Sequence, residues 1–153
     1  MSLKLNAPTE LKQWVGKVLG RSEPLLIDQS VISRFAAATG DDQWIHVDTA
    51  RALRDMPNGK TIAHGYLVLA LLPVLMREIL DVGGCRQRIN YGSNRIRFIT
   101  PVLEGSRVRL AVSLLDVNAR SSDSILATFE NRMNIEGVEK PAMIAETMTL
   151  FQI

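Results

Sequence analysis

The feature that most constrains the fold is a change of hydrophobic period near Gln87. Before this point apolar residues recur at the three- and four-residue spacing of amphipathic helices, and residues 66–76 form an apolar run broken only by a proline. After it, apolar and polar residues alternate, as they do in half-buried strands. A long apolar helix needs a sheet to cover it. The sequence therefore predicts an α+β domain in which a curved antiparallel sheet wraps around a long central apolar helix.

The first half of the chain is divided by residues that cap helices. An amphipathic helix is expected over residues 11–18, followed by a brief strand over residues 25–27. Asp28 or Ser30 can cap the next helix, and Gly40 can end it in the left-handed conformation. The apolar face of that helix is expected to comprise Val31, Ile32, Phe35 and Ala38.

Two further helices are expected before the period changes. Asp48 can cap a helix that runs to Asp55, and a Pro-Asn-Gly turn follows it. The central helix is expected to begin near Ala63 and to end at Val82. Pro73 removes a backbone donor inside it, so a kink is expected there.

The alternating pattern in the second half of the chain predicts strands over residues 94–98, 107–114, 125–135 and 142–151. The connections between them are too short for helical crossovers, so consecutive strands are expected to pair antiparallel. Four arginines would then share one face of paired strands, where they could bind phosphates or simply face solvent. They are Arg95, Arg97, Arg107 and Arg109.

The length, charge and cysteine count of the chain argue against several classes of partner. The chain has 153 residues, which suits one domain over residues 1–153. Its 18 basic and 16 acidic residues form no long run, so no nucleic-acid partner is expected. The apolar run is shorter than the roughly 20 residues that span a bilayer, and the first residues do not form a secretory signal, so no membrane partner is expected. Cys85 is the only cysteine, which suits a reducing compartment such as the cytoplasm.

Because several common catalytic motifs are absent, carboxylate and imidazole groups are the remaining candidates for site chemistry. The sequence has no glycine-rich dinucleotide or phosphate loop, no serine-hydrolase elbow and no zincin motif. Its two histidines and one cysteine are far apart in sequence, so no metal site is expected.

Asp41 and His46 are the candidate pair within this chemistry. Both follow a helix end, and a pair at this spacing can hold and deprotonate a water molecule. The alternative is a surface carboxylate beside a half-buried, hydrogen-bonded ring. Two other carboxylates are assigned differently: Asp48 is expected to cap a helix, and Asp42 to face solvent.

Further along the chain, Gly65, His64 and Asn94 are candidates for binding or orienting a substrate. Gly65 opens the central helix, where its N–H could bind a carbonyl oxygen that gains negative charge, although close packing against the sheet explains this glycine equally well. His64 is expected to orient or pack against its neighbours rather than transfer protons. Gly92 suggests a strand bulge, and Asn94 offers an amide that could orient a substrate.

These residues together resemble one family. Residues 35–46, FAAATGDDQWIH, followed by residues 62–65, IAHG, are similar to the signature of the MaoC-like family, the R-specific enoyl-CoA hydratases. Residues 89–102, INYGSNRIRFITPV, resemble the NodN-like branch of that family. The resemblance implies a single hot-dog domain and a homodimer in which two sheets join into one.

The resemblance also implies an activity, the reversible addition of water to a trans-2-enoyl thioester to give the R-3-hydroxyacyl thioester. The thioester would be carried by CoA or by acyl carrier protein, and no metal or redox cofactor would be needed. Asp41 and His46 would activate the water, and the Gly65 N–H would bind the thioester carbonyl. Gln43 and Trp44 stand where many members have asparagine and proline, so Gln43 keeps an amide on a longer arm.

Two other functions remain open from the sequence. A hot-dog acyl-CoA thioesterase would use a carboxylate near the same helix to direct water at the thioester carbonyl. A non-catalytic acyl-thioester binding protein would need neither Asp41 nor His46. The spacing of that pair and the glycine at position 65 favour hydration.

Overall fold

The computed structural model describes residues 2–153 as a single α+β domain with a long curved sheet. Four long strands follow the change of period. In chain order the elements are β1 (Leu3–Leu5), the 3-10 helix η1 (Pro8–Trp14), β2 (Val18–Arg21), β3 (Leu25–Ile27), α1 (Gln29–Thr39), α2 (Trp44–Val47), α3 (Thr49–Asp55), α4 (Gly65–Ala70), α5 (Leu72–Ile79), β4 (Leu80–Val82), β5 (Gln87–Phe98), β6 (Ser106–Ser121), β7 (Ser124–Ile135) and β8 (Met143–Gln152).

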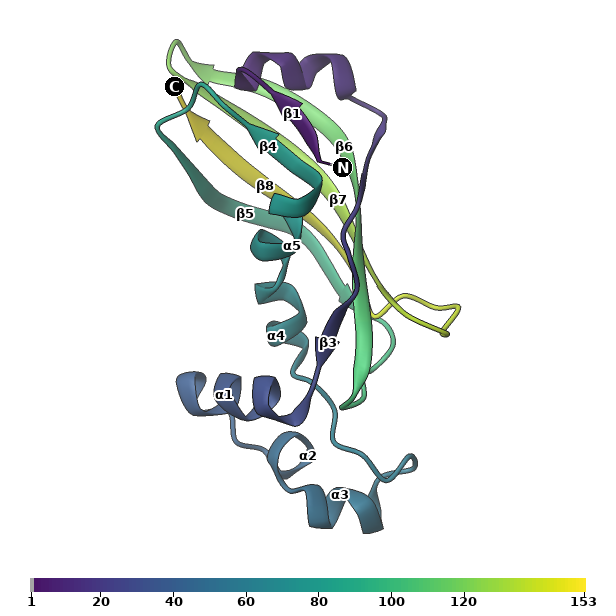
Figure 1. Cartoon of the computed structure of the whole chain (residues 1–153). Helices are drawn as coiled ribbons and strands as arrows, with labels where there is room; N and C mark the ends of the chain where they lie inside the picture. Colours follow the sequence, from purple (N-terminus) through teal and green to yellow (C-terminus); the bar gives the residue numbers. More distant parts are fainter. Residues whose placement is uncertain (1) are drawn as a thin grey trace.

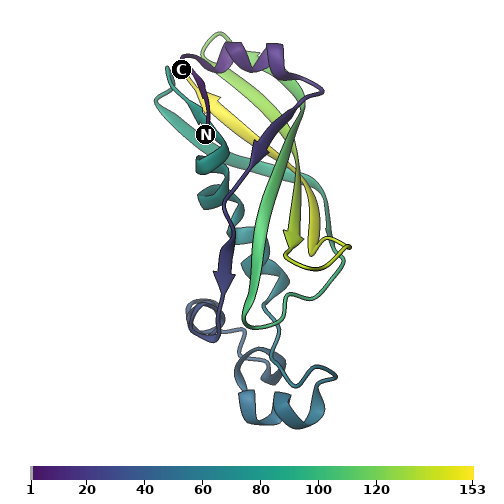
Figure 2. The same ribbon diagram turned by 45° about the vertical axis from the view of Figure 1, so that its right-hand side comes forward.

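The large sheet has the strand order β2-β6-β7-β8-β5, and β3 also pairs with β6. All of these pairings are antiparallel. The sheet curves around α4 and α5, while α1, α2 and α3 gather beyond one end of it (Figures 1 and 2). The predicted architecture of a curved antiparallel sheet around an apolar helix is therefore confirmed.

The core lies between α4–α5 and the concave face of the sheet. Alternate residues of β6 and β7 point inward, as their period predicted, and pack with the buried face of the helices. The buried residues that these elements contribute include Leu67, Val68, Leu72, Leu75, Ile79, Val108, Leu110, Val112, Leu114, Phe129 and Met133.

The central helix departs from the prediction in two ways. It is broken rather than kinked, because Pro73 lies in the first turn of α5, where a missing N–H costs nothing. It also ends at Ile79 instead of Val82. Leu80 is extended and pairs with Leu3, so residues 80–82 form a parallel strand with β1.

The prediction of a helix over residues 11–18 is also wrong. The chain forms the 3-10 helix η1, which begins at Pro8 and ends at Trp14, and Val18 already belongs to a strand that pairs with Ser113. Gly16 has a φ of 78°, a left-handed conformation that turns the chain between these two elements.

The capping predictions hold for α1 and α3. The Asp28 side chain accepts from Val31 N at 2.9 Å, and Gly40 ends α1 with a φ of 78°. Asp48 Oδ1 accepts from Arg51 N at 2.8 Å at the start of α3, and Asp42 is exposed. One position on the apolar face of α1 is corrected: Ala36 is buried and Ala38 is exposed.

Strand pairing matches the prediction for β6, β7 and β8 but not for β5. β5 pairs with β8 at the far edge of the sheet, so Arg95 and Arg97 do not neighbour Arg107 and Arg109 as expected. The register of β5 shifts between Asn90 and Gly92, which confirms the bulge predicted from that glycine. Within residues 2–153, no helix has both the length and the apolar character to cross a membrane.

Candidate active site

The site is built where α1 ends. Gly40 turns the chain out of the helix, and residues 44–47 then form the short helix α2 where an irregular loop was expected. This turn of helix directs His46 inward, leaving it 8% exposed, while Asp41 remains exposed to solvent. Of the pair, Asp41 therefore contacts solvent and His46 is enclosed by protein.

The position of the proton on the His46 ring follows from its partner. Nδ1 lies 2.7 Å from the carbonyl oxygen of Ile62, which can only accept a hydrogen bond. Nδ1 must then carry the hydrogen, and in the neutral ring Nε2 keeps a free lone pair. The alternative interpretation of His46 as a half-buried, hydrogen-bonded ring is correct about the hydrogen bond, and the ring is more deeply buried than expected. The bond to Nδ1 still leaves Nε2 available as a base.

His64 joins the pair from the other side, as the residue before α4. Its Nε2 donates to the main-chain oxygen of Asp41 at 2.8 Å, by the same reasoning. Its ring stacks on that of His46 with centroids 3.8 Å apart and an interplanar angle of 24°. His64 is 2% exposed, and its Nδ1 has no hydrogen-bond partner within residues 2–153. These contacts fit the orienting role expected for it.

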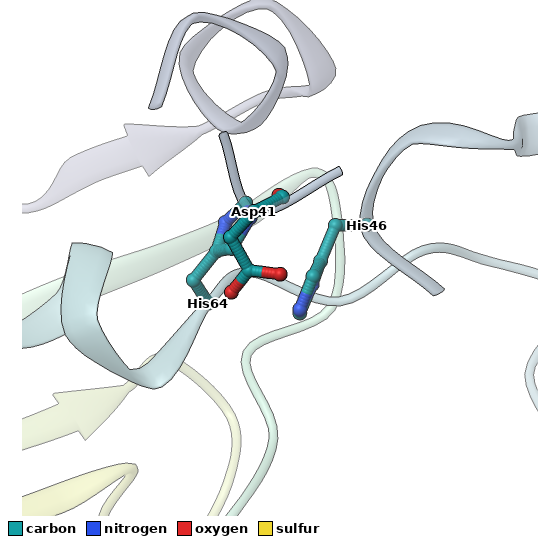
Figure 3. A group of neighbouring side chains, drawn as sticks. All are labelled: Asp41, His46 and His64. Atoms are coloured by element: carbon teal, nitrogen blue, oxygen red, sulfur yellow. The ribbon is translucent and has the colours of Figure 1, made fainter. Parts of the chain in front are cut away.

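Asp41, His46 and His64 form one cluster in which the carboxylate stands beside the two rings (Figure 3). One donor atom from each residue lies within 4.8 Å of the others. A water molecule with two ordinary hydrogen bonds bridges atoms up to about 5 Å apart, so the separation between the Asp41 carboxylate and a ring nitrogen of His46 suits one water molecule. One aspartate and two histidines are also a donor set that a zinc ion accepts.

Gln29 supports this cluster, and its role was not foreseen from the sequence. Its Nε2 donates to the main-chain oxygen of His46 at 2.8 Å, and its Oε1 accepts from the Thr61 hydroxyl at 2.5 Å. Ile62 N also donates to Ile45 O at 3.0 Å. α1 thus ties α2 to the segment that carries His64. No local motif marks this role of Gln29, because the partners that tie it to the cluster, His46 and Thr61, are 17 and 32 positions away.

Gly65 follows His64 directly and is the first residue of α4. A Cβ at this position would lie 3.0 Å from the Phe98 ring, so a larger residue here would have to displace that ring at the end of β5. Both explanations offered for this glycine remain compatible, because packing at its Cα leaves the N–H of the first residue of α4 unchanged.

The remaining predicted site residues lie apart from these contacts. Gln43 is exposed at the start of α2, and its side chain does not cap the helix. Asn94 donates its amide to Glu146 at 2.6 Å and so links β5 to β8. Trp44 is partly buried and stacks against the Arg51 guanidinium, 4.1 Å from the ring centroid.

Comparison with known proteins gives a consistent result. The model of the MaoC-like domain matches residues 10–133. The chain is 43% identical over 142 residues to 3-hydroxyacyl-thioester dehydratase Z of Mycobacterium tuberculosis (strain H37Rv), covering 93% of each protein. It is 40% identical over 147 residues to nodulation protein N of Rhizobium meliloti (strain 1021), covering 94% of this chain and 90% of that protein.

A solved structure gives the same fold. R-hydratase PhaJ1 of Pseudomonas aeruginosa superposes with a TM-score of 0.72 at 24% identity, covering 88% of this chain and 79% of that chain. This likeness shows the hot-dog fold that the sequence resemblance implied.

Proposed function

The chain belongs to the family of MaoC-like dehydratases and is a hydro-lyase, and on that premise we propose that it hydrates trans-2-enoyl thioesters. The product would be the R-3-hydroxyacyl thioester, and the reaction would be reversible. The observation that carries the proposal is that an accessible carboxylate on Asp41 lies near the His46 ring, whose Nδ1 is already bonded to Ile62 O, with one donor atom of each residue within 4.8 Å of the other.

Each residue has a distinct task in the proposed reaction. Asp41 takes a proton from the water, and the oxygen of that water forms a bond to C3 of the enoyl group. The electron pair of the double bond moves onto the thioester oxygen, near the Gly65 N–H, and C2 then receives a proton. His46 holds the water through Nε2 and shares in the proton transfers, while His64 holds the Asp41 main chain.

The first experiment follows the absorbance of the conjugated enoyl thioester when the purified chain meets crotonyl-CoA and longer trans-2-enoyl-CoAs. Loss of absorbance with the thioester intact, insensitive to a chelator, supports metal-free hydration. Release of free thiol from saturated acyl-CoAs would show a thioesterase instead. Binding of acyl-CoA without turnover in either assay would show a binding protein. Acyl carrier protein thioesters, run in parallel, identify the natural carrier.

We also propose that two copies form a homodimer through β5. This strand is at the edge of the sheet, twelve residues long, and almost entirely exposed. Its apolar side chains Ile89, Tyr91 and Phe98 are 38%, 48% and 48% exposed. A long edge strand of this kind needs cover, and a second copy would extend the sheet. Light scattering on the eluting protein checks this, and a monomeric mass at micromolar concentration would contradict it.

A further inference from the structure

The helix that carries His46 depends on other segments for its position. α2 comprises only four residues, and the Gln43 side chain does not cap it. A helix this short has little stability of its own, because the nucleating turn costs more than its few hydrogen bonds return. The position of His46 is therefore set by the segments that bond to α2, among them the neighbouring α1 (Figure 1) and residues 61–62.

Two direct hydrogen bonds join α2 to residues 61–62. Ile62 N donates to Ile45 O at 3.0 Å, and His46 Nδ1 donates to Ile62 O at 2.7 Å. Glu104 N in turn donates to Thr61 O at 2.9 Å, which fixes this segment to the chain just before β6. The orientation of the His46 ring thus depends on how α2 is held against a segment that the sheet anchors.

The amide of Gln29 makes a third link between the same two segments. Its Nε2 donates to His46 O at 2.8 Å, and a carbonyl oxygen can only accept, so Oε1 must be the atom that faces Thr61. The Thr61 hydroxyl, on a side chain in a residue only 2% exposed, then donates to Oε1 at 2.5 Å. The amide also donates to the exposed Ser33 hydroxyl at 3.2 Å. Both ends of the bond between His46 and Ile62 are therefore held by one side chain.

Gln29 also belongs to the helix that leads to Asp41. It is the first residue of α1, and Asp41 follows Gly40 at the other end of that helix. At 1.5 Å per residue, an α-helix of this length is a rigid element about 16 Å long. α1 therefore carries Asp41 through the chain and contacts His46 through the Gln29 amide.

We propose that Gln29 is a positioning residue, which sets the place of His46 relative to Asp41 by acting through the Thr61 hydroxyl and the His46 main chain. Its effect on turnover rests on the proposed function. Without the amide, His46 O and the Thr61 hydroxyl lose their shared partner, and α2 can shift against α1. Misplacement of a reacting group by up to 1 Å costs about 10- to 100-fold in rate.

The kinetic test removes each part of the link in turn. Gln29→Met keeps a side chain of similar length without polar atoms, and kcat for crotonyl-CoA should fall by about 10- to 100-fold with little change in KM. Thr61→Val should show the same loss, and Thr61→Ser, which keeps the hydroxyl, should recover most of it. The combination of Gln29→Met and Thr61→Val should be no worse than the larger single loss, because both break one link. Ser33→Ala is the control, and it should keep the wild-type kcat.

Several results would overturn the inference. They are an unchanged kcat per folded molecule in Gln29→Met, losses that add fully in the double variant, and a fall in Ser33→Ala as large as that in Gln29→Met. A lowered thermal midpoint with kcat per folded molecule kept would show a purely structural role and would overturn it too. Should Gln29→Met not fold, the comparison of Thr61→Val with Thr61→Ser decides, and equal kcat in these two variants would overturn the inference.

A second readout needs no turnover. The chain has two histidines, so the ring N–H signals in a ¹H–¹⁵N spectrum can be assigned with His64→Gln. The Nδ1–H signal of His46, protected by its bond to Ile62 O, should shift or exchange with water in Gln29→Met and should stay in Thr61→Ser. An unchanged signal in Gln29→Met would overturn the inference. If the wild-type chain leaves crotonyl-CoA unchanged, the proposed function fails, and this spectrum still decides the role of Gln29.

Discussion

The sheet and the candidate site hold their residues by different means. In β6, β7 and β8 most residues are placed by pairing with one or two neighbouring strands, and the inward-facing residues also by apolar neighbours in the core. In the site, the His46 ring is oriented by one carbonyl and the His64 ring by another. Loss of one contact in the sheet leaves many others, whereas loss of one contact in the site releases a reacting group. Stability and activity should therefore respond to different substitutions.

The largest effect is expected from Asp41→Asn, which removes the proposed base without altering the shape of the side chain. Loss of one proton-transfer group typically lowers turnover by about 100- to 10,000-fold. Because Asp41 is exposed, the thermal midpoint should stay close to that of the wild type. Hydration of crotonyl-CoA and circular dichroism measure the two quantities. Full activity in this variant would remove Asp41 from the mechanism.

Leu110→Ala, in the middle of β6, tests the opposite case, in which stability falls and activity is kept. Leu110 is 0% exposed, and a cavity in such a place costs about 2–5 kcal/mol of unfolding free energy. Turnover per folded molecule should change little, since the sheet around the cavity keeps its register. Urea denaturation gives the stability, and kcat measured well below the midpoint gives the activity. A tenfold fall in kcat in fully folded protein would show that the two regions are not separate.

His64 offers a matched pair of variants within the site. His64→Phe keeps a ring to stack on His46 but cannot donate to the Asp41 carbonyl, and His64→Gln keeps a donor but no ring. Misplacement of a reacting group by a fraction of an ångström to 1 Å costs about 10- to 100-fold, so His64→Phe should lower kcat by this amount with little change in KM. His64→Gln should recover part of the loss. Equal activity of both variants and the wild type would exclude a positioning role.

Asp48→Ala should have the smallest effect. This carboxylate lies seven positions beyond Asp41 but caps α3, and loss of an N-cap costs about 0.5–2 kcal/mol. The expected result is a modestly lowered urea midpoint with kcat unchanged. A fall in kcat comparable to that of Asp41→Asn would mean that the two aspartates act together.

The parts of the fold that depend on neighbours in sequence could be predicted. Caps at Asp28 and Asp48 and the end of α1 at Gly40 involve residues within one turn of helix. The placement of β5 beside β8 could not be predicted, because the short connection at Glu104 and Gly105 favoured a pairing with β6 instead. Pro73 predicted a kink in the central helix, at the place where the structure has a break between α4 and α5, but the strand at residues 80–82 depends on β1, almost eighty residues earlier in the chain.

The sequence by itself determined which residues are candidates for the chemistry and which faces are apolar, because helix ends, strand period and motif spacing are local properties. Tertiary structure alone decided that His46 presents Nε2 and that His64 holds the Asp41 main chain. The carbonyl that orients His46 is 16 positions away, and the one that binds His64 is 23 positions away. A hydrogen bond across such a separation depends on where the folded chain places both partners, and no local pattern records that position.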